Sequence, residues 1–231
     1  MKEPRTILKP EAVIFDFDGV IVDTEPLHFE ALRKVLEPLG IRIEWEEYVR
    51  TYMGFDDRDA FHEAFHSRGT DLDDRRMAEL LSSKSKLFQE VIRSGVRDYP
   101  GAVSLIASLH AAGLPLAISS GALRSDILPV VTLLRIDHCF SHIVAADDVR
   151  KSKPDPESYT LAFQRLKRSH PALLTTPDRS LAVEDTPAGI RSAKRAGLRV
   201  LAVTNSYGEE ELAEADYLTG SLNDVRISRS G

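Results

Sequence analysis

Two pairs of acidic residues each follow a short apolar run of the chain. They are Asp16 with Asp18, and Glu184 with Asp185. Side chains two residues apart in an extended chain point the same way, so Asp16 and Asp18 share one side. Burying anions together is costly unless a cation or a proton compensates them. A hard cation that takes oxygen ligands, such as Mg²⁺, meets this need. A polar strand end with a turn at Gly19 is the alternative for the first pair.

Two further positions offer groups that bind anions. Ser120 and Gly121 end another apolar run and precede a predicted helix, where a hydroxyl and backbone N–H groups can hold an anion. Lys153 stands just before a predicted helix and offers a positive charge. A plain serine N-cap and a solvent-exposed lysine are the simpler alternatives, and Lys151 competes with Lys153 for any role.

Apolar runs alternate with helical patterns through most of the chain. The runs lie at residues 12–15, 114–118, 143–146, 181–183 and 200–203, and the helical patterns at residues 102–112, 123–134, 157–167 and 188–196. Continuous apolar runs are typical of strands buried on both faces. Their alternation with helices predicts right-handed βαβ units in an α/β fold, a doubly wound, Rossmann-like parallel sheet. Ligands bind at the carboxyl ends of such strands, where the motifs above are placed.

One long segment breaks this alternation. Amphipathic helices are predicted there at residues 26–39, 57–67 and 75–92. A block of roughly 70 residues is too long for a loop. We therefore predict a helical domain at residues 24–94, inserted after the first strand of an α/β core that consists of residues 1–23 and 95–231.

The composition excludes several classes of protein. With 231 residues, 42% of them hydrophobic, the chain is too apolar for a disordered protein. A net charge of −6 argues against a nucleic-acid partner. We expect neither a signal peptide nor a membrane span, because no apolar run approaches the roughly 18 residues that a span needs. The single cysteine, Cys139, excludes an intrachain disulfide and fits a reducing, cytoplasmic compartment. We expect a monomer.

In this order, the motifs resemble those of the haloacid dehalogenase superfamily. The segment from Asp16 to Thr24, DFDGVIVDT, is similar to the first motif of that family. Ser120 is similar to the second motif, Lys153 with the following proline to the third, and Glu184-Asp185 to the fourth. The resemblance covers about residues 11–225 and is closest to the branch of β-phosphoglucomutases and small sugar-phosphate phosphatases.

The resemblance implies a role for each acidic residue. Asp16 would be the nucleophile that forms an aspartyl-phosphate, and Asp18 the general acid and then the base. The side chains of Asp16 and Asp185 and the backbone carbonyl of Asp18 would hold Mg²⁺, with Glu184 in or near this set of ligands. Carbon–halogen and phosphonate chemistry in this superfamily do not need the acid at Asp18. Its presence therefore favours C–O–P chemistry.

The remaining core motifs would bind the phosphoryl group. Ser120 and the backbone N–H of Gly121 would hold its oxygens, and Lys153 would neutralise charge on the nucleophile and on the phosphate. Phosphoryl transfer depends on positioning and electrostatic stabilisation, and these groups would supply both.

The resemblance also makes the helical block a cap that closes over the site and excludes water. His28 matches a histidine near the hinge, the segment from Gly54 to Arg58 takes the place of a substrate-reading loop, and Lys84 takes that of a cap lysine. Exposed positions are the alternatives for His28 and Lys84. β-Phosphoglucomutases carry an arginine for a distal phosphate where this chain has Asp57, with Arg58 one residue further on.

The sequence therefore predicts a Mg²⁺-dependent phosphatase of small phosphorylated metabolites, in particular sugar phosphates. A hexose-phosphate mutase is the alternative with the same core residues, because a sugar hydroxyl then replaces water as the acceptor. The acid at position 57 disfavours this mutase. A catalytically silent binding protein on the same fold is a further alternative, but its signature would be a lost nucleophile, lysine or metal-binding acid. None of these residues is lost here.

Overall fold

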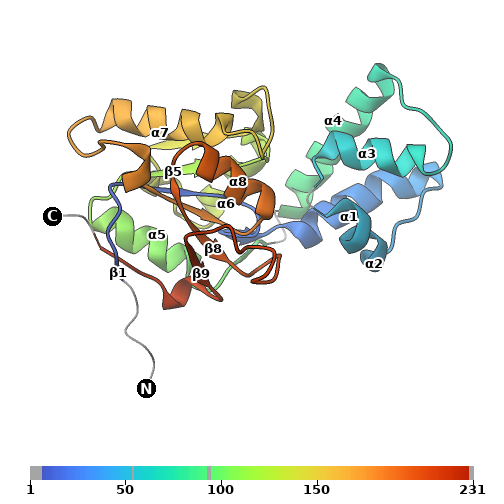
Figure 1. The fold of residues 1–231 in the computed structure, drawn as a ribbon. Coiled ribbons are helices and arrows are strands. Elements are labelled where there is room, and N and C mark those ends of the chain that lie inside the picture. Colours follow the sequence, from blue (N-terminus) through green and yellow to red (C-terminus); the bar gives the residue numbers. More distant parts are fainter. Residues whose placement is uncertain (1–6, 54, 93–94, 229–231) are drawn as a thin grey trace. The chain divides into compact units, whose positions relative to one another are not determined.

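A computed structural model describes residues 7–53, 55–92 and 95–228 of the chain. The chain forms two compact units (Figure 1). The first unit joins Met1–Asp23 to Arg97–Gly231, and the second spans Thr24–Val96. The sequence predicts these boundaries after residues 23 and 94.

The first unit is built around a parallel sheet of six strands, in the order β6-β5-β2-β7-β8-β9. Its strands are β2 (Val13–Phe15), β5 (Leu116–Ser119), β6 (His142–Val144), β7 (Leu181–Glu184), β8 (Arg199–Val203) and β9 (Tyr217–Thr219). The chain leaves β2 towards β5 and β6, and then returns to β7, β8 and β9 on the other side of β2. This order confirms the doubly wound parallel sheet that the sequence predicted.

Helices cover both faces of this sheet. They are α5 (Ala102–Ala111), α6 (Arg124–Leu133), α7 (Glu157–Ser169) and α8 (Pro187–Arg195), and α5 and α7 lie on opposite faces in Figure 1. Because helices cover both faces, the strands bury apolar side chains on both faces. On one of them, Ile14, Ala117 and Val144 pack in a cluster with Tyr159 and Leu166 of α7. Among the described helices, none has the length and apolar character needed to cross a membrane.

Several short elements of the first unit were not predicted. They are β1 (Ile7–Leu8), β3 (Val22–Asp23), β4 (Arg97–Asp98), β10 (Arg226–Ile227) and the short helices η3 (Asp137–Cys139), η4 (Ala146–Asp148), η5 (Pro177–Arg179) and η6 (Leu222–Asp224). β1 pairs with β10 and β3 pairs with β4. Two- and three-residue elements contain too few residues for a hydrophobic period. The edge strand β9 was missed because Leu218 is exposed and the residues on either side of it are only partly buried.

In the described part of the second unit, every regular element is a helix. It consists of α1 (Glu25–Leu36), η1 (Glu37–Leu39), α2 (Trp45–Glu47), η2 (Tyr48–Tyr52), α3 (Asp57–His66) and α4 (Asp74–Ile92). Leu32 and Leu36 of α1, Phe61 of α3 and Leu80 of α4 form a hydrophobic core of its own. The three amphipathic patterns correspond to α1 with η1, to α3 and to α4. The segment from α2 to η2 was missed, because aromatic stacking such as that of Trp45 on Tyr48 shapes it.

Candidate active site

Three neighbouring strands bring the acidic motifs and the serine motif to one edge of the sheet. Phe15 of β2 is in register with Ile118 of β5 and with Val183 of β7. The residues that follow these three therefore lie at the same level of the sheet, and Asp16 is the residue that follows β2. Because β2 lies between the two halves of the doubly wound sheet, this carboxyl edge is the topological switch point where ligands bind in such folds.

Lys153 reaches this edge from the loop before α7. Its Nζ lies 2.9 Å from Oδ1 of Asp16 and 2.7 Å from Oε1 of Glu184, and it donates a 3.1 Å hydrogen bond to the carbonyl of Ser119. Burial alone favours the neutral amine, but the charges of Asp16 and Glu184 raise the pKa of Lys153 above its ordinary value. Lys151 instead has 73% of its side chain exposed and pairs with Asp155. The lysine of the site is therefore Lys153.

Asp16, Glu184 and Asp185 form a buried acidic cluster in which one oxygen of each lies within 4.8 Å of the others. Burial, and then the charge of Glu184, raise the pKa of Asp16 to about 7, although Lys153 opposes this shift. Burial and the charge of Asp16 also raise the pKa of Asp185 well above its ordinary value. Lys153 alone does not offset the cost of burying these acids.

The hydrogen bonds within the cluster distinguish Glu184 from Asp185. Glu184 accepts from Lys153 and from the hydroxyl of Tyr159, which lies 2.7 Å from Oε1, while its Oε2 accepts from the backbone N–H of Asp185. Asp185 accepts from the hydroxyl of Ser206 at Oδ2, but its buried Oδ1 has no hydrogen-bond partner among the described residues. Such an oxygen beside a second carboxylate fits a hard cation, so these residues can accommodate Mg²⁺.

Gly19 lets the first motif approach Asp185 closely. Its φ of +76° is a left-handed conformation, and a Cβ at this position would lie 1.8 Å from Oδ2 of Asp185. Asn205 fixes the same turn by donating a 2.7 Å hydrogen bond to the carbonyl of Gly19. Asn205 and Ser206 were missed in the sequence, although they closely follow the apolar run of β8. Polar residues just after a buried strand were the available signal.

Glu184 is held by two more residues that sequence reasoning missed. Tyr159 is fully buried on α7, and its hydroxyl stays protonated because burial and the charge of Glu184 raise its pKa well above the ordinary value. Gly189 of α8 passes so close that a Cβ would lie 2.0 Å from the carboxyl carbon of Glu184. Both residues fix the direction of this carboxylate, which in turn holds Lys153.

The serine motif forms a loop before α6. The backbone N–H of Ser120 donates to Val144, and its hydroxyl oxygen accepts from the N–H of Ala122 at 2.9 Å. The N-cap of α6 is Leu123, so the simpler explanation of Ser120 as a helix N-cap is wrong. Asp147 accepts from the first N–H of α6, that of Arg124, so the groups expected to bind an anion lie in the loop before this helix and not in its first turn. Ser120 and Gly121 stand in the loop between β5 and this helix.

The second unit contains a buried charged group of its own. Lys84 of α4 has only 3% of its surface exposed, pairs with Asp57 at the start of α3 and lies 3.0 Å from Nδ1 of His28. The ring of His28 stacks on Phe88 at 4.2 Å. Burial and the charge of Lys84 lower the pKa of His28 well below its ordinary value, so the neutral ring accepts from the lysine. An exposed position is therefore wrong for Lys84, and His28 is half-buried.

The other predicted cap residues lie at the start of α3. The side chain of Asp56 caps this helix by accepting from the N–H of Asp59. Arg58, on the first turn, is exposed to solvent. Gly54 lies outside the described residues. Asp57 and Arg58 therefore differ in environment, because only Asp57 shares in the buried charged group with Lys84.

A family model for haloacid dehalogenase-like hydrolases matches residues 13–203. The chain belongs to the haloacid dehalogenase-like hydrolase family. The match spans all four motifs, and it confirms both the family that the sequence resembles and the prediction of a hydrolase.

Relatives of this hydrolase match most of its length. A phosphorylated carbohydrates phosphatase of Thermotoga maritima is 30% identical over 203 residues, which cover 86% of this chain and 88% of that protein. Protein CbbY of Rhodobacter capsulatus is 33% identical over 222 residues, which cover 92% of this chain and 94% of that protein. The crystal structure of CbbY from Rhodobacter sphaeroides in complex with phosphate gives a TM-score of 0.81 at 28% identity, over 92% of this chain and 95% of that chain.

Proposed function

We propose that this hydrolase is a Mg²⁺-dependent phosphatase of small phosphorylated metabolites, in particular sugar phosphates. The observation that carries the proposal is the buried acidic cluster, in which Asp16 contacts Lys153 and Asp185 keeps one oxygen without a partner among the described residues. This arrangement suits a divalent cation and a phosphoryl group together. The phosphatase of phosphorylated carbohydrates and the phosphate-bound CbbY support this choice of substrate.

Asp16 and Asp185 would hold the ion through their side chains and Asp18 through its backbone carbonyl, with Glu184 beside them. Bound Mg²⁺ would neutralise the acids and polarise the phosphoryl oxygens. Gly19 and Ser206 keep Asp185 in place for this role, because the first leaves room for its carboxylate and the second donates to it.

The reaction proceeds in two displacements at phosphorus. An oxygen of Asp16 forms a bond to phosphorus while the bond to the sugar oxygen breaks, and Asp18 gives its proton to that oxygen. Asp18 then takes a proton from water as the water oxygen attacks the aspartyl-phosphate, which releases phosphate and restores the carboxylate. Lys153 favours the ionised, nucleophilic form of Asp16 against the effect of burial.

The other core residues position the reacting groups and neutralise the charge on the phosphoryl group. Glu184, itself held by Tyr159, accepts from Lys153 and so fixes the ammonium beside Asp16. The hydroxyl oxygen of Ser120 accepts from the backbone, so its hydrogen is available to a phosphoryl oxygen. Together with the backbone N–H of Gly121, it would stabilise the charge that spreads over these oxygens in the transition state.

The helical unit, residues 24–94 as the sequence delimits it, would act as the cap of this enzyme. Lys84 and His28 would face the substrate from that unit, and the segment from Gly54 to Arg58 would read its shape. The charge of Lys84 is already paired with Asp57. A mutase must grip a second phosphate, and an acid at position 57 opposes this. The geometry therefore supports a phosphatase above a mutase.

A panel of phosphorylated metabolites tests the proposal. Release of inorganic phosphate is measured from sugar monophosphates, with Mg²⁺ and after EDTA treatment. We expect release that stops with EDTA and returns with Mg²⁺. Activity that EDTA leaves unchanged would contradict the metal site. Conversion of β-glucose 1-phosphate to glucose 6-phosphate without net phosphate release would instead identify a mutase, and inactivity on every compound would support a silent binding protein.

A further inference from the structure

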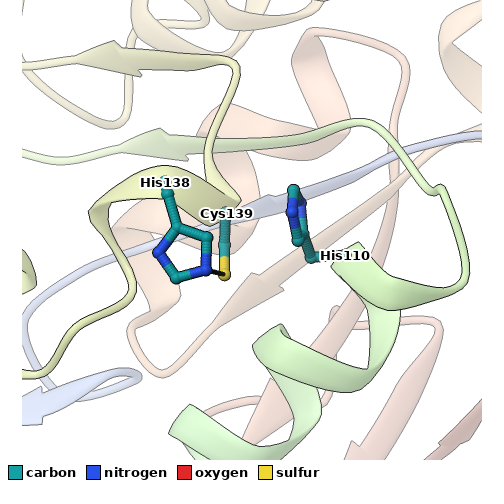
Figure 2. Close-up of side chains that lie close together, drawn as sticks. All are labelled: His110, His138 and Cys139. Atoms are coloured by element: carbon teal, nitrogen blue, oxygen red, sulfur yellow. Dashed lines mark hydrogen bonds between the residues drawn. The ribbon is translucent and has the colours of Figure 1, made fainter.

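A second group of metal-binding side chains lies outside the candidate active site. His110, His138 and Cys139 each offer one ligand atom, and these atoms lie within 4.8 Å of one another. Figure 2 shows the three side chains close together, with His110 projecting from α5 and the other two from η3. Two imidazoles and a thiol form a softer donor set than the carboxylates of the acidic cluster.

This cluster stands at the opposite edge of the sheet from the acidic cluster. His110 lies in the last turn of α5, which leads into the start of β5, and η3 leads into the start of β6. Both elements therefore precede the amino-terminal ends of parallel strands, whereas Asp16 and Asp185 follow carboxyl ends. The two sites are separate in the fold and differ in their chemistry.

One distance within the cluster matches that between two ligands of a tetrahedral ion. Nε2 of His138 lies 3.6 Å from Sγ of Cys139. Zinc bonds of about 2.05 Å to nitrogen and about 2.3 Å to sulfur, at tetrahedral angles, also separate these two atoms by about 3.6 Å. The rings of His110 and His138 are nearly perpendicular, at 88°, with centroids 5.5 Å apart, so that one presents its edge to the other.

The surroundings also suit a bound ion. Oδ1 of Asp137 lies 4.0 Å from Nδ1 of His138, beyond hydrogen-bond distance, while Nε2 of the same ring lies toward the sulfur of Cys139. The negative charge of this carboxylate near the ring favours a bound cation. Cys139 is buried and both histidines are exposed, so the sulfur is fixed while the ion can enter from solvent.

We propose that His110, His138 and Cys139 bind a divalent transition metal ion, with Zn²⁺ preferred and water in the fourth position. Thiolate and imidazole ligands select Zn²⁺ over Mg²⁺, which keeps to oxygen. On binding, the S–H bond of Cys139 breaks, its proton passes to solvent, and the sulfur forms its bond to the ion. The ion then joins the end of α5 to η3.

Calorimetric titration of metal-free protein with Zn²⁺, in excess Mg²⁺, tests this site. We expect one Zn²⁺ per chain at this cluster, with affinity at least roughly tenfold weaker in His110→Ala and in His138→Ala. Co²⁺ serves as a spectroscopic probe, because a thiolate ligand gives a charge-transfer band in the near ultraviolet. This band should be absent from Cys139→Ser. It should persist in Asp185→Asn, which separates this site from the acidic cluster.

The exposed pair His62 and His66 on α3 provides the matched control. These rings are stacked with centroids 5.5 Å apart and form a second histidine pair that could bind Zn²⁺. His62→Ala should bind Zn²⁺ as the wild type does. The proposal is overturned if the wild type binds no Zn²⁺, if Co²⁺ gives no thiolate band, or if His62→Ala weakens binding while His110→Ala does not.

Discussion

The ammonium of Lys153 lies 2.9 Å from the carboxylate of Asp16, in a site where both side chains are about nine-tenths buried. This ion pair opposes the effect of burial, which otherwise holds the proton on Asp16. The contact places a cation beside the oxygen that the proposed mechanism uses as the nucleophile. The same contact places the ammonium where the negative charge of a phosphoryl group would collect.

Replacing Lys153 should remove both the ion pair with Asp16 and the positive charge beside the phosphoryl group. We expect Lys153→Met to lower kcat/KM by roughly 100-fold or more, which is the effect of losing one preorganised charge. It should also destabilise the fold by about 3 kcal/mol, because buried acids lose their partner. Phosphate release and urea unfolding measure the two effects. Lys151→Met is the control, and equal losses in both variants would contradict the assignment of Lys153.

A methyl group at Gly19 should displace Asp185. We expect Gly19→Ala to weaken Mg²⁺ binding and phosphate release strongly, since its Cβ would lie 1.8 Å from Oδ2. Gly40→Ala separates this clash from backbone strain, because Gly40 has a similar φ of +79° and open space around it. That control should lose only about 1–2 kcal/mol of stability. Similar Mg²⁺ affinity in both variants, measured by calorimetry, would show that the clash is harmless.

The stabilising effect of Mg²⁺ should grow with pH. The pKa of Asp16 is about 7 in the folded chain, against an ordinary 3.8, so the folded state holds this proton more tightly than the unfolded state. The metal-free protein therefore loses stability as the pH rises from about 4 to about 7. Mg²⁺ needs ionised carboxylates, so its affinity increases over the same range.

Thermal unfolding checks this pH dependence. At about 100 times its Kd at pH 8, Mg²⁺ should raise the Tm by roughly 5 °C, and the same Mg²⁺ concentration should have a smaller effect at pH 5.5. Asp185→Asn should abolish most of the increase at the higher pH. A Tm increase that is the same at both pH values, or that survives in this variant, would argue against Mg²⁺ binding at the acidic cluster.

The buried group of the helical unit yields a prediction about the substrate. If Lys84 faces the substrate from the cap, Lys84→Met should raise KM at least roughly tenfold, the cost of one charge-assisted hydrogen bond. Lys86→Met, which changes an exposed lysine of the same helix, should leave KM unchanged. Unfolding curves show whether the unit remains folded. An unchanged KM in folded Lys84→Met would remove this residue from substrate binding.

The sequence predicted the core of the fold and the acidic site because both follow from local patterns. Buried parallel strands produce unbroken apolar runs, and the polar residue that ends each run must lie at the ligand-binding edge. Asp16, Glu184 and Asp185 were found in this way. The four separated motifs fixed the family, although each one alone has an ordinary structural explanation.

Other features depend on partners that are distant in the chain. Nothing local to Lys84 indicates that it is buried, because Asp57 and His28 lie 27 and 56 residues away. Tyr159 has the pattern of a core aromatic residue, and only the fold brings its hydroxyl to Glu184. The helix predicted at residues 123–134 agrees with α6 to within one residue, but its contact with Asp147, which accepts from the first N–H and lies 23 residues further along the chain, could not be predicted.

A phosphoenzyme on Asp16 is the central claim, and borohydride trapping tests it most directly. Asp18→Ala is mixed with a nitrophenyl phosphate, because its leaving group needs no acid to depart. The intermediate should then accumulate, since the variant lacks the base for its hydrolysis. Borohydride then reduces an aspartyl-phosphate to homoserine, which mass spectrometry locates in the chain. We predict homoserine at position 16, only with substrate and Mg²⁺ present. Modification at another residue, or undiminished phosphate release by Asp16→Asn, would contradict the account.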